Sequence, residues 1–429
     1  MKLRPLFFAC LATALVACSA VSVDTYQGTT QSVSAPIKSA ADSFNYRYMT
    51  LENNLSVLLI SDPDSPKAAA ALDVMVGSGE NPIERGGLAH FLEHMLFMGT
   101  EKYPDADDYE RYILENGGGR NAYTSFEHTN YFFDIKADAL EGALDRFAQF
   151  FIAPLLDPAY IEREKNAVDA EYHMGLKSDG RRALDVIREL ADKDHPYSRF
   201  TVGNLQSLAD GDGQNIRDDL VAFYERYYSA QSMRLVVFGP QDLDTLAAMV
   251  TPRFTAIPDR GNPVSDVKAP LFDPEKLPAV LAIEPVATQR EVQLLFPVGD
   301  YRANYRSKPL AYIGNLLGHE GAGSLLSYLK AQGLAESVGA GADLNWRGGT
   351  VFSISIALSE KGASDWQAVV AATFAYIDLL KSKGPEAWRF AEQGELAAIN
   401  FRFREDMGPQ GYVTQVANAM QYFDPEDVL

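Results

Sequence analysis

The chain has 429 residues, of which 47% are hydrophobic and 22% are charged, so it is long enough to bury a substantial core. A single core stops growing at about 250–300 residues, and we therefore expect two domains. The 38 basic and 58 acidic residues give a net charge of −20, which argues against nucleic acid as a partner, because phosphate binding needs a basic surface. An acidic chamber that attracts cationic peptides fits this charge, and so does simple solubility.

The N-terminus is predicted to direct export. Two basic residues precede an apolar run, 6–16, that is too short to span a bilayer comfortably. The segment ends Leu15-Val-Ala-Cys18, which resembles a bacterial lipobox, and we expect 1–17 to be a lipoprotein signal peptide and Cys18 to be acylated. Residues 18–40, rich in Ser, Thr, Val and Ala, are expected to form a flexible tether. The protein would then be lipid-anchored in the bacterial envelope, on the outer membrane facing the periplasm; the alternative is an ordinary signal peptide with a chance cysteine.

Residues 41–257 are predicted to form the first domain. Strand patterns cover 47–60, 68–77, 121–127, 129–135 and 233–238. Helical patterns follow Gly87 and cover 106–116, 138–151, 158–175, 214–228 and 242–252. Paired strands followed by helices indicate an α+β fold, in which helices cover an antiparallel-rich sheet.

A second round of elements follows a Pro-, Asp- and Lys-rich stretch, 258–278, which we interpret as a linker. Residues 279–429 are expected to form a second domain, with strands at 280–283, 291–297 and 351–358 and helices at 307–317, 324–331 and 364–382. Because the order resembles the first round, we expect two successive, homologous α/β-sandwich domains. The chain ends on a helix and the start of another, so the second domain is expected to be incomplete.

The segment His90-Phe-Leu-Glu93-His94 is predicted to carry the chemistry. On a helix, His90 and His94 project from one face a turn apart, a spacing that suits two ligands of a tetrahedral metal ion. Glu93 lies beside His94, within reach of a metal-bound water. The flanking residues are apolar nearly all round, so the helix is buried and its ionisable groups need partners. The alternative is two satisfied core histidines beside a chance glutamate.

A catalytic zinc needs a third protein ligand, and both cysteines lie within the first 18 residues, so a carboxylate is the natural candidate. In the helical pattern 158–175, Glu164 and Glu171 are seven residues apart on the apolar, inward face, where a carboxylate is costly without a cation. Helix geometry selects both without deciding between them. The alternative is that both pair with Arg or Lys.

The H-x-x-E-H pattern resembles the inverzincin motif of the pitrilysin/insulinase metallopeptidase family. That family places its third ligand inside an E-x(6)-E pair, which Glu164 and Glu171 match. Three further stretches, 119–134, 147–172 and 318–330, are similar to family segments, and the resemblance runs from about residue 40 to the end of the chain.

The resemblance implies one zinc ion per chain, held by His90, His94 and Glu171. Glu93 would be the general base, and Glu164 would orient a ligand or tune its charge. The implied function is a zinc-dependent endopeptidase that hydrolyses peptides in the bacterial cell envelope.

The resemblance also implies six residues that contact the peptide: Asn121, Ala122, Phe97, Tyr123, Gly321 and Gly323. The first pair would bind peptide backbone by strand addition. The second pair would line an apolar side-chain pocket, or else belong to the core. The third pair would lie near an exosite for the substrate's N-terminus, or else form a simple turn.

The longest members of this family carry two such halves closed as a clamshell, and the chain resembles the N-terminal half. We therefore expect a C-terminal half or a second subunit as a partner. The alternative function is a catalytically inert envelope lipoprotein that binds peptides or assists assembly. The intact motif argues against it, because non-catalytic subunits usually lose the motif.

Overall fold

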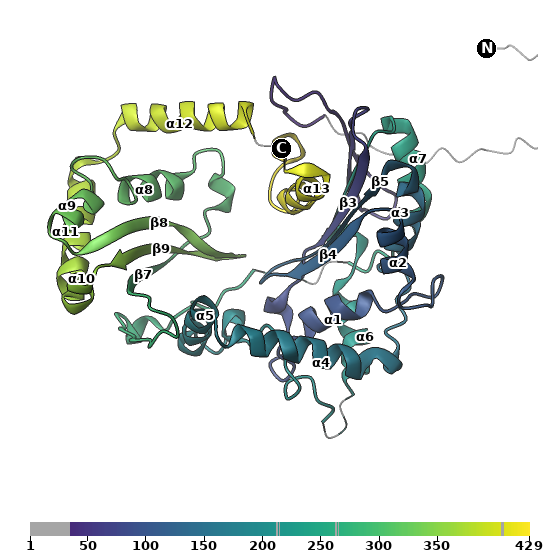
Figure 1. Cartoon of the computed structure of the whole chain (residues 1–429), viewed down its shortest axis with the longest axis horizontal. Coiled ribbons are helices and arrows are strands. Elements are labelled where there is room, and N and C mark those ends of the chain that lie inside the picture. The colour runs from purple at the N-terminus through teal and green to yellow at the C-terminus, as the bar shows by residue number, and fades with distance from the viewer. Residues whose placement is uncertain (1–34, 212, 214, 262–263, 265, 405–406) are drawn as a thin grey trace, which may run out of the picture.

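The computed structural model describes residues 35–211, 213, 215–261, 264, 266–404 and 407–429 (Figure 1). The expected signal peptide, Cys18 and most of the expected tether lie outside these residues. Among the helices described, none is long and apolar enough to cross a membrane.

The first sheet has six strands in the order β1-β2-β6-β3-β5-β4. Their bounds are β1 (Asn45–Thr50), β2 (Ser56–Ser61), β3 (Lys67–Val74), β4 (Gly119–Thr124), β5 (Thr129–Lys136) and β6 (Met233–Gly239). Neighbours run antiparallel except β2 and β6, which are parallel. Among the described strands β4 pairs only with β5, so its other edge can accept another strand.

Helices cover one face of this sheet (Figure 1). Their bounds are α1 (Leu88–Leu96), α2 (Asp108–Glu115), α3 (Leu140–Gln149), α4 (Pro158–Gly175), α6 (Ile216–Tyr227) and α7 (Leu243–Phe254). Helix α5 (Asp179–Leu190) lies apart from this sheet, and its Ile187 packs with Leu271 and Trp346. The core between these helices and the sheet includes Ala68 and Ala70 of β3 and Phe91 and Met95 of α1, all fully buried. Burial of α1 agrees with its apolar surroundings in the sequence.

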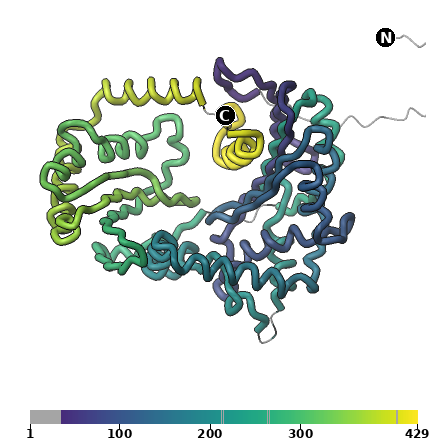
Figure 2. Tube along the Cα trace, viewed as in Figure 1, coloured from purple at the N-terminus to yellow at the C-terminus, as the bar shows by residue number. Residues whose placement is uncertain are grey.

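The last helix, α13 (Gly408–Ala419), lies on the opposite face of the same sheet. Val413 and Val416 pack there against Ala69 and Ala71, the alternate residues of β3. Figure 2 shows the C-terminal end of the chain beside the strands of the N-terminal part. These residues were expected in the second domain. The structure packs them on the first sheet, because β3 is apolar on both faces and needs a cover on each side. The expected boundaries at 257 and 279 stay a prediction.

The second sheet has the strand order β7-β9-β8 and is antiparallel. Its strands are β7 (Glu291–Val298), β8 (Ala335–Trp346) and β9 (Gly349–Leu358), and the helices of this part are α8 (Pro309–Leu317), α9 (Leu325–Ala331), α10 (Glu360–Ser364), α11 (Trp366–Lys383) and α12 (Ala387–Arg402). Helices over antiparallel-rich sheets in both parts confirm the predicted α+β class.

Two expectations for this part differ from the structure. The expected strand at 280–283 is an exposed segment without regular structure. The long strand β8 was not identified from the sequence, because it is an edge strand rich in Gly and polar residues. Its mixed exposure gives no strict apolar alternation.

Candidate metal centre

Helix α1 presents the two histidines of the motif. It begins after Gly87, whose φ of 89° is a left-handed conformation that favours glycine. A Cβ on Gly87 would also lie 2.2 Å from the Cα of Gly203, so only glycine permits this approach. The contact places the loop around Gly203 directly against the start of α1.

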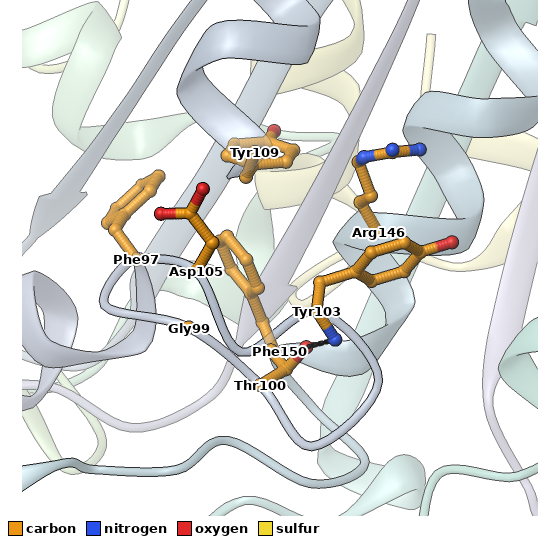
Figure 3. Close-up of a pocket in the computed structure, with 8 residues that line it drawn as sticks. All are labelled: Phe97, Gly99, Thr100, Tyr103, Asp105, Tyr109, Arg146 and Phe150. Atoms are coloured by element: carbon orange, nitrogen blue, oxygen red, sulfur yellow. Dashed lines mark hydrogen bonds between the residues drawn. The ribbon is translucent and has the colours of Figure 1, made fainter. Parts of the chain in front are cut away.

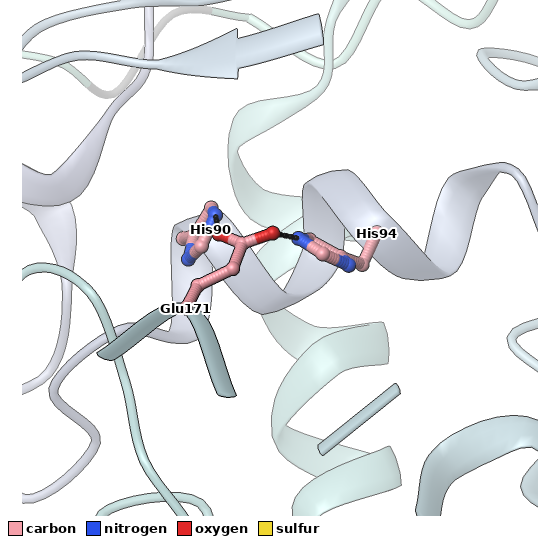
Figure 4. Close-up of side chains that lie close together, drawn as sticks. All are labelled: His90, His94 and Glu171. Carbon is pink, nitrogen blue, oxygen red and sulfur yellow. Dashed lines mark ion pairs between the residues drawn. The ribbon is translucent and has the colours of Figure 1, made fainter. Parts of the chain in front are cut away.

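Helix α4 brings Glu171 to the two histidines (Figure 4). The Nε2 atom of His90 is 3.4 Å from one carboxylate oxygen of Glu171, and Nε2 of His94 is 3.7 Å from the other. Donors around a tetrahedral zinc with bonds of about 2.0–2.1 Å lie about 3.3 Å apart, close to both separations. Within the described residues, His90, His94 and Glu171 are the one group of three or more His, Cys, Asp or Glu side chains whose ligand atoms all lie within 4.8 Å of one another.

The other ring nitrogen of each histidine has its own partner. The Nδ1 atom of His90 lies 2.7 Å from the carbonyl oxygen of Val202, which requires a proton on Nδ1. The Nδ1 atom of His94 lies 3.2 Å from a carboxylate oxygen of Glu164. Both contacts favour the tautomer that leaves Nε2 unprotonated and able to bind a metal.

The charges at this cluster favour a cation. A proton on Nε2 of His90, which a metal ion would replace, donates to Glu171 and holds the pKa of Glu171 below its ordinary value, so this carboxyl is ionised near neutral pH. Burial raises the pKa of Glu164, but hydrogen bonds from His94 and Arg163 outweigh it and hold that pKa low. Two carboxylates therefore face two imidazoles, a donor set that suits zinc.

Glu93 is buried beside the cluster with one carboxylate oxygen held. The hydroxyl of Thr124, at the end of β4, donates to Oε2 of Glu93 at 2.6 Å. Burial raises the pKa of Glu93 above its ordinary value, although His90 and the Thr124 hydrogen bond lower it. A carboxylate with a raised pKa is a stronger base. Thr124 was not among the residues expected at the site, although side chains two apart on a strand face the same side, so Thr124 lies on the same side of β4 as Ala122.

Strand β4 also carries three of the residues expected to contact a peptide. Asn121 and Tyr123 are exposed and Ala122 is half-buried, on a strand that packs beside α1. Phe97 follows α1 and lines a small pocket (Figure 3). Its ring also lies 5.2 Å from that of Phe150, so it contributes to the aromatic core as well.

Gly321 and Gly323 lie elsewhere, in the loop between α8 and α9. Figure 1 shows these helices on the second sheet, on the far side of the molecule from α1. The structure therefore brings the expected zinc ligands, Glu93 and the β4 residues together, and it leaves the two glycines apart from them.

Comparisons with known proteins agree with this arrangement. Residues 56–203 match the family described as Insulinase (Peptidase family M16), and 215–394 match the one described as Peptidase M16 inactive domain. The insulin-degrading enzyme of Homo sapiens is 39% identical over 395 residues, which cover 91% of this chain and 39% of that protein. The A-factor-processing enzyme of Saccharomyces cerevisiae is 37% identical over 388 residues, which cover 90% of this chain and 38% of that protein.

The crystal structure of pitrilysin has the same fold, with a TM-score of 0.89 and 35% sequence identity over 93% of this chain and 43% of that one. This chain thus spans only 39% of the length of the human relative and 38% of the yeast one. Two successive domain matches and a shared fold lead to one conclusion: the chain belongs to the pitrilysin/insulinase family (peptidase family M16) of zinc metallopeptidases.

Proposed function

We propose that the chain is a zinc-dependent endopeptidase that hydrolyses peptides in the bacterial cell envelope. The observation that carries the proposal is the cluster of His90, His94 and Glu171 beside the buried carboxylate of Glu93. Two imidazole nitrogens and a carboxylate that converge on one point are the donors that a zinc ion prefers.

In this proposal one zinc ion is held by Nε2 of each histidine and by the carboxylate of Glu171. When bound, zinc polarises the scissile carbonyl and lowers the pKa of water, which are the two contributions that peptide hydrolysis needs from it. Val202 and Glu164 hold the two imidazoles in the orientation and tautomer that ligation requires. Glu171 is half-exposed, so the centre is open to a substrate from solvent.

Glu93 acts as the general base. Thr124 fixes one oxygen of its carboxylate, and the other oxygen takes up the proton of the attacking water and passes it to the leaving amine. Its raised pKa brings the carboxyl nearer the working pH, which increases the driving force for proton uptake.

The open edge of β4 binds the substrate as an added strand. Asn121 and Ala122 lie on this edge, beside α1, so that a peptide paired with them passes the zinc cluster. Backbone pairing gives affinity for many sequences and leaves the preference to side-chain pockets, such as the small one that Phe97 lines. Tyr123 lies on the other face of β4, against His128 and Phe132, so it does not share that pocket, contrary to the expectation from the sequence. An acidic protein also favours cationic peptides.

The test combines metal analysis with Glu93→Gln. The purified chain is expected to hold about one zinc, and Glu93→Gln is expected to keep that zinc while losing peptidase activity by about 10²–10⁴-fold. Glu189→Gln, an exposed change on α5, is the control and is expected to leave both unchanged. If the zinc-loaded wild type does not cleave peptides, the result favours the alternative, an inert envelope lipoprotein.

A further inference from the structure

The turn between β4 and β5, residues 125–128, directly follows the threonine that holds Glu93. The turn is closed by hydrogen bonds from the backbone N–H of Ser125 to the carbonyl of His128 and from the N–H of His128 to the hydroxyl of Ser125. Any displacement of this turn therefore moves Thr124, and with it the hydroxyl that contacts Glu93. We refer to residues 125–128 as the β4–β5 turn.

One side of the β4–β5 turn is fixed by the first domain itself. The N–H groups of Ser78 and Gly79 donate to the carbonyls of Ser125 and Phe126 at 2.9 and 2.8 Å. A Cβ on Gly77 would lie 2.4 Å from the carbonyl oxygen of Ser125, so the two segments are in close contact. Residues 77–80 and the β4–β5 turn thus form one packed unit.

The other side of the turn is held from the second sheet. Arg347 lies at the tip of the β8–β9 hairpin, and its backbone N–H donates to Glu127 at 2.5 Å. Its guanidinium donates to Glu80 at 2.6 Å and lies 3.4 Å from Glu127. Arg302 completes the group with a 2.8 Å bond to the second oxygen of Glu127.

These charges are buried, so the arginines are needed to balance them. Glu127 is 4% exposed, and the side chains of Glu80 and Arg347 are each about 15% exposed. Removing the guanidinium of Arg347 takes away the ion-pair partner of Glu80, while Glu127 keeps Arg302 and the backbone N–H of residue 347. A buried carboxylate without a partner moves toward water or takes up a proton, and either response shifts the segment that carries it.

An apolar contact joins the same two parts. The indole of Trp346, the neighbour of Arg347, packs edge-on against His195 with ring centres 5.1 Å apart. Phe126 of the β4–β5 turn lies 6.5 Å from the same imidazole and 5.5 Å from the ring of Tyr197. The hairpin tip therefore reaches the turn through both an ionic and an aromatic contact.

We propose that Arg347 is a positioning residue for the peptidase reaction: from the second sheet it fixes the β4–β5 turn, and thereby the hydroxyl of Thr124 against Glu93. The inference rests on the proposed function, because it concerns the same catalytic base. The position of β4 supports it, because an edge strand with a single neighbour among the described strands has fewer contacts to hold its end in place. The second sheet thus contributes to the active site without touching it.

The test is a double-mutant cycle between Arg347→Met and Thr124→Val. Arg347→Met is expected to lower kcat by about 100-fold with zinc content unchanged, since small misplacements of a catalytic group cost about this much. If Arg347 acts through Thr124, the same change made in the Thr124→Val background lowers kcat further by only about threefold or less. Arg290→Met is the control, because Arg290, just before β7, pairs with Glu360 at the start of α10, away from the turn.

A readout independent of activity accompanies the cycle. Amide hydrogen exchange in residues 119–129 is expected to accelerate in Arg347→Met and to stay unchanged in Arg290→Met. Arg347→Lys, which keeps a cation beside Glu127, is expected to restore most of kcat and serves if the Met variant does not fold. If the two fold-losses in kcat multiply in the double mutant, or if amide exchange in the turn is unchanged, the positioning role of Arg347 is overturned and the proposed function is not affected. A zinc-loaded wild type without turnover overturns the proposed function, and with it the role of Arg347 in catalysis.

Discussion

Replacing Glu164 by Gln tests how the structure prepares His94 for a metal. Glu164 is 8% exposed, accepts from Nδ1 of His94 and is approached by Nε of Arg163 at 2.9 Å. The amide keeps an acceptor for the imidazole but removes the negative charge, so the guanidinium of Arg163 is left uncompensated beside a cation site. We therefore expect weaker zinc binding with the three ligands still in place.

The size of the effect follows from the role of the contact. Loss of a carboxylate that orients a ligating histidine costs about 10–100-fold in metal affinity, or about 1.4–2.7 kcal/mol at 1.36 kcal/mol per tenfold change. Glu164→Gln keeps a neutral hydrogen bond and is expected at the lower end of this range, and Glu164→Ala at the upper end.

The assay is competition for zinc against a chromogenic chelator at pH 7. Glu189→Gln on α5 is the control, because its side chain is 81% exposed and pairs with the exposed Lys193. The reasoning is refuted if Glu164→Gln binds zinc as tightly as wild type while His94→Ala does not. That result would mean that Glu164 leaves the ligand geometry unaffected.

Three further predictions concern the metal, the pH dependence and the N-terminus. Removing zinc with a chelator should abolish peptide cleavage and lower Tm, and adding zinc back should restore both. A metal ion present at a free concentration of 100 times its Kd stabilises the folded state by about 2.7 kcal/mol. An unchanged Tm would contradict zinc binding at the folded centre. Burial raises the pKa of Glu80 from its ordinary 4.5 to about 7 although Arg347 lowers it, so the native state holds more protons than the unfolded one between these values. The free energy of unfolding should then fall as pH rises from 5 to 7, measured by urea denaturation, and Glu80→Gln should flatten this slope whereas the exposed Glu189→Gln should not. Cys18→Ser should move the protein from the membrane to the soluble fraction; retention in the membrane would argue against acylation.

Helix periodicity was sufficient to predict the centre of the site. His90 and His94 are four residues apart on one short helix, so their relation is local and survives any tertiary arrangement. The inward face of α4 identified Glu164 and Glu171, but which of them meets Nε2 depends on how α4 crosses α1. Helix geometry left that choice open and the family resemblance made it; the structure places Glu171 at the ligand atoms and Glu164 behind His94.

Contacts between distant segments could not be predicted. Thr124 meets Glu93 only because β4 packs beside α1. Arg347 and Glu127 are 220 residues apart and come from different sheets. In the fold, β8 escaped detection because an edge strand does not need apolar alternation. The packing position of α13 could not be predicted either, because the apolar face of a helix does not indicate which of two sheets the helix covers.

The place of α13 has a consequence for synthesis of the chain. The strands of the first sheet are complete once Gly239 has been made, but the helix that covers their second face begins at Gly408, 169 residues later. At about 5–20 residues per second, the apolar strip of Ala69, Ala71 and Val236 waits roughly 10–30 s for its cover. The first domain therefore reaches its native packing only after the second has been translated, and a nascent chain halted before Gly408 should aggregate through this strip.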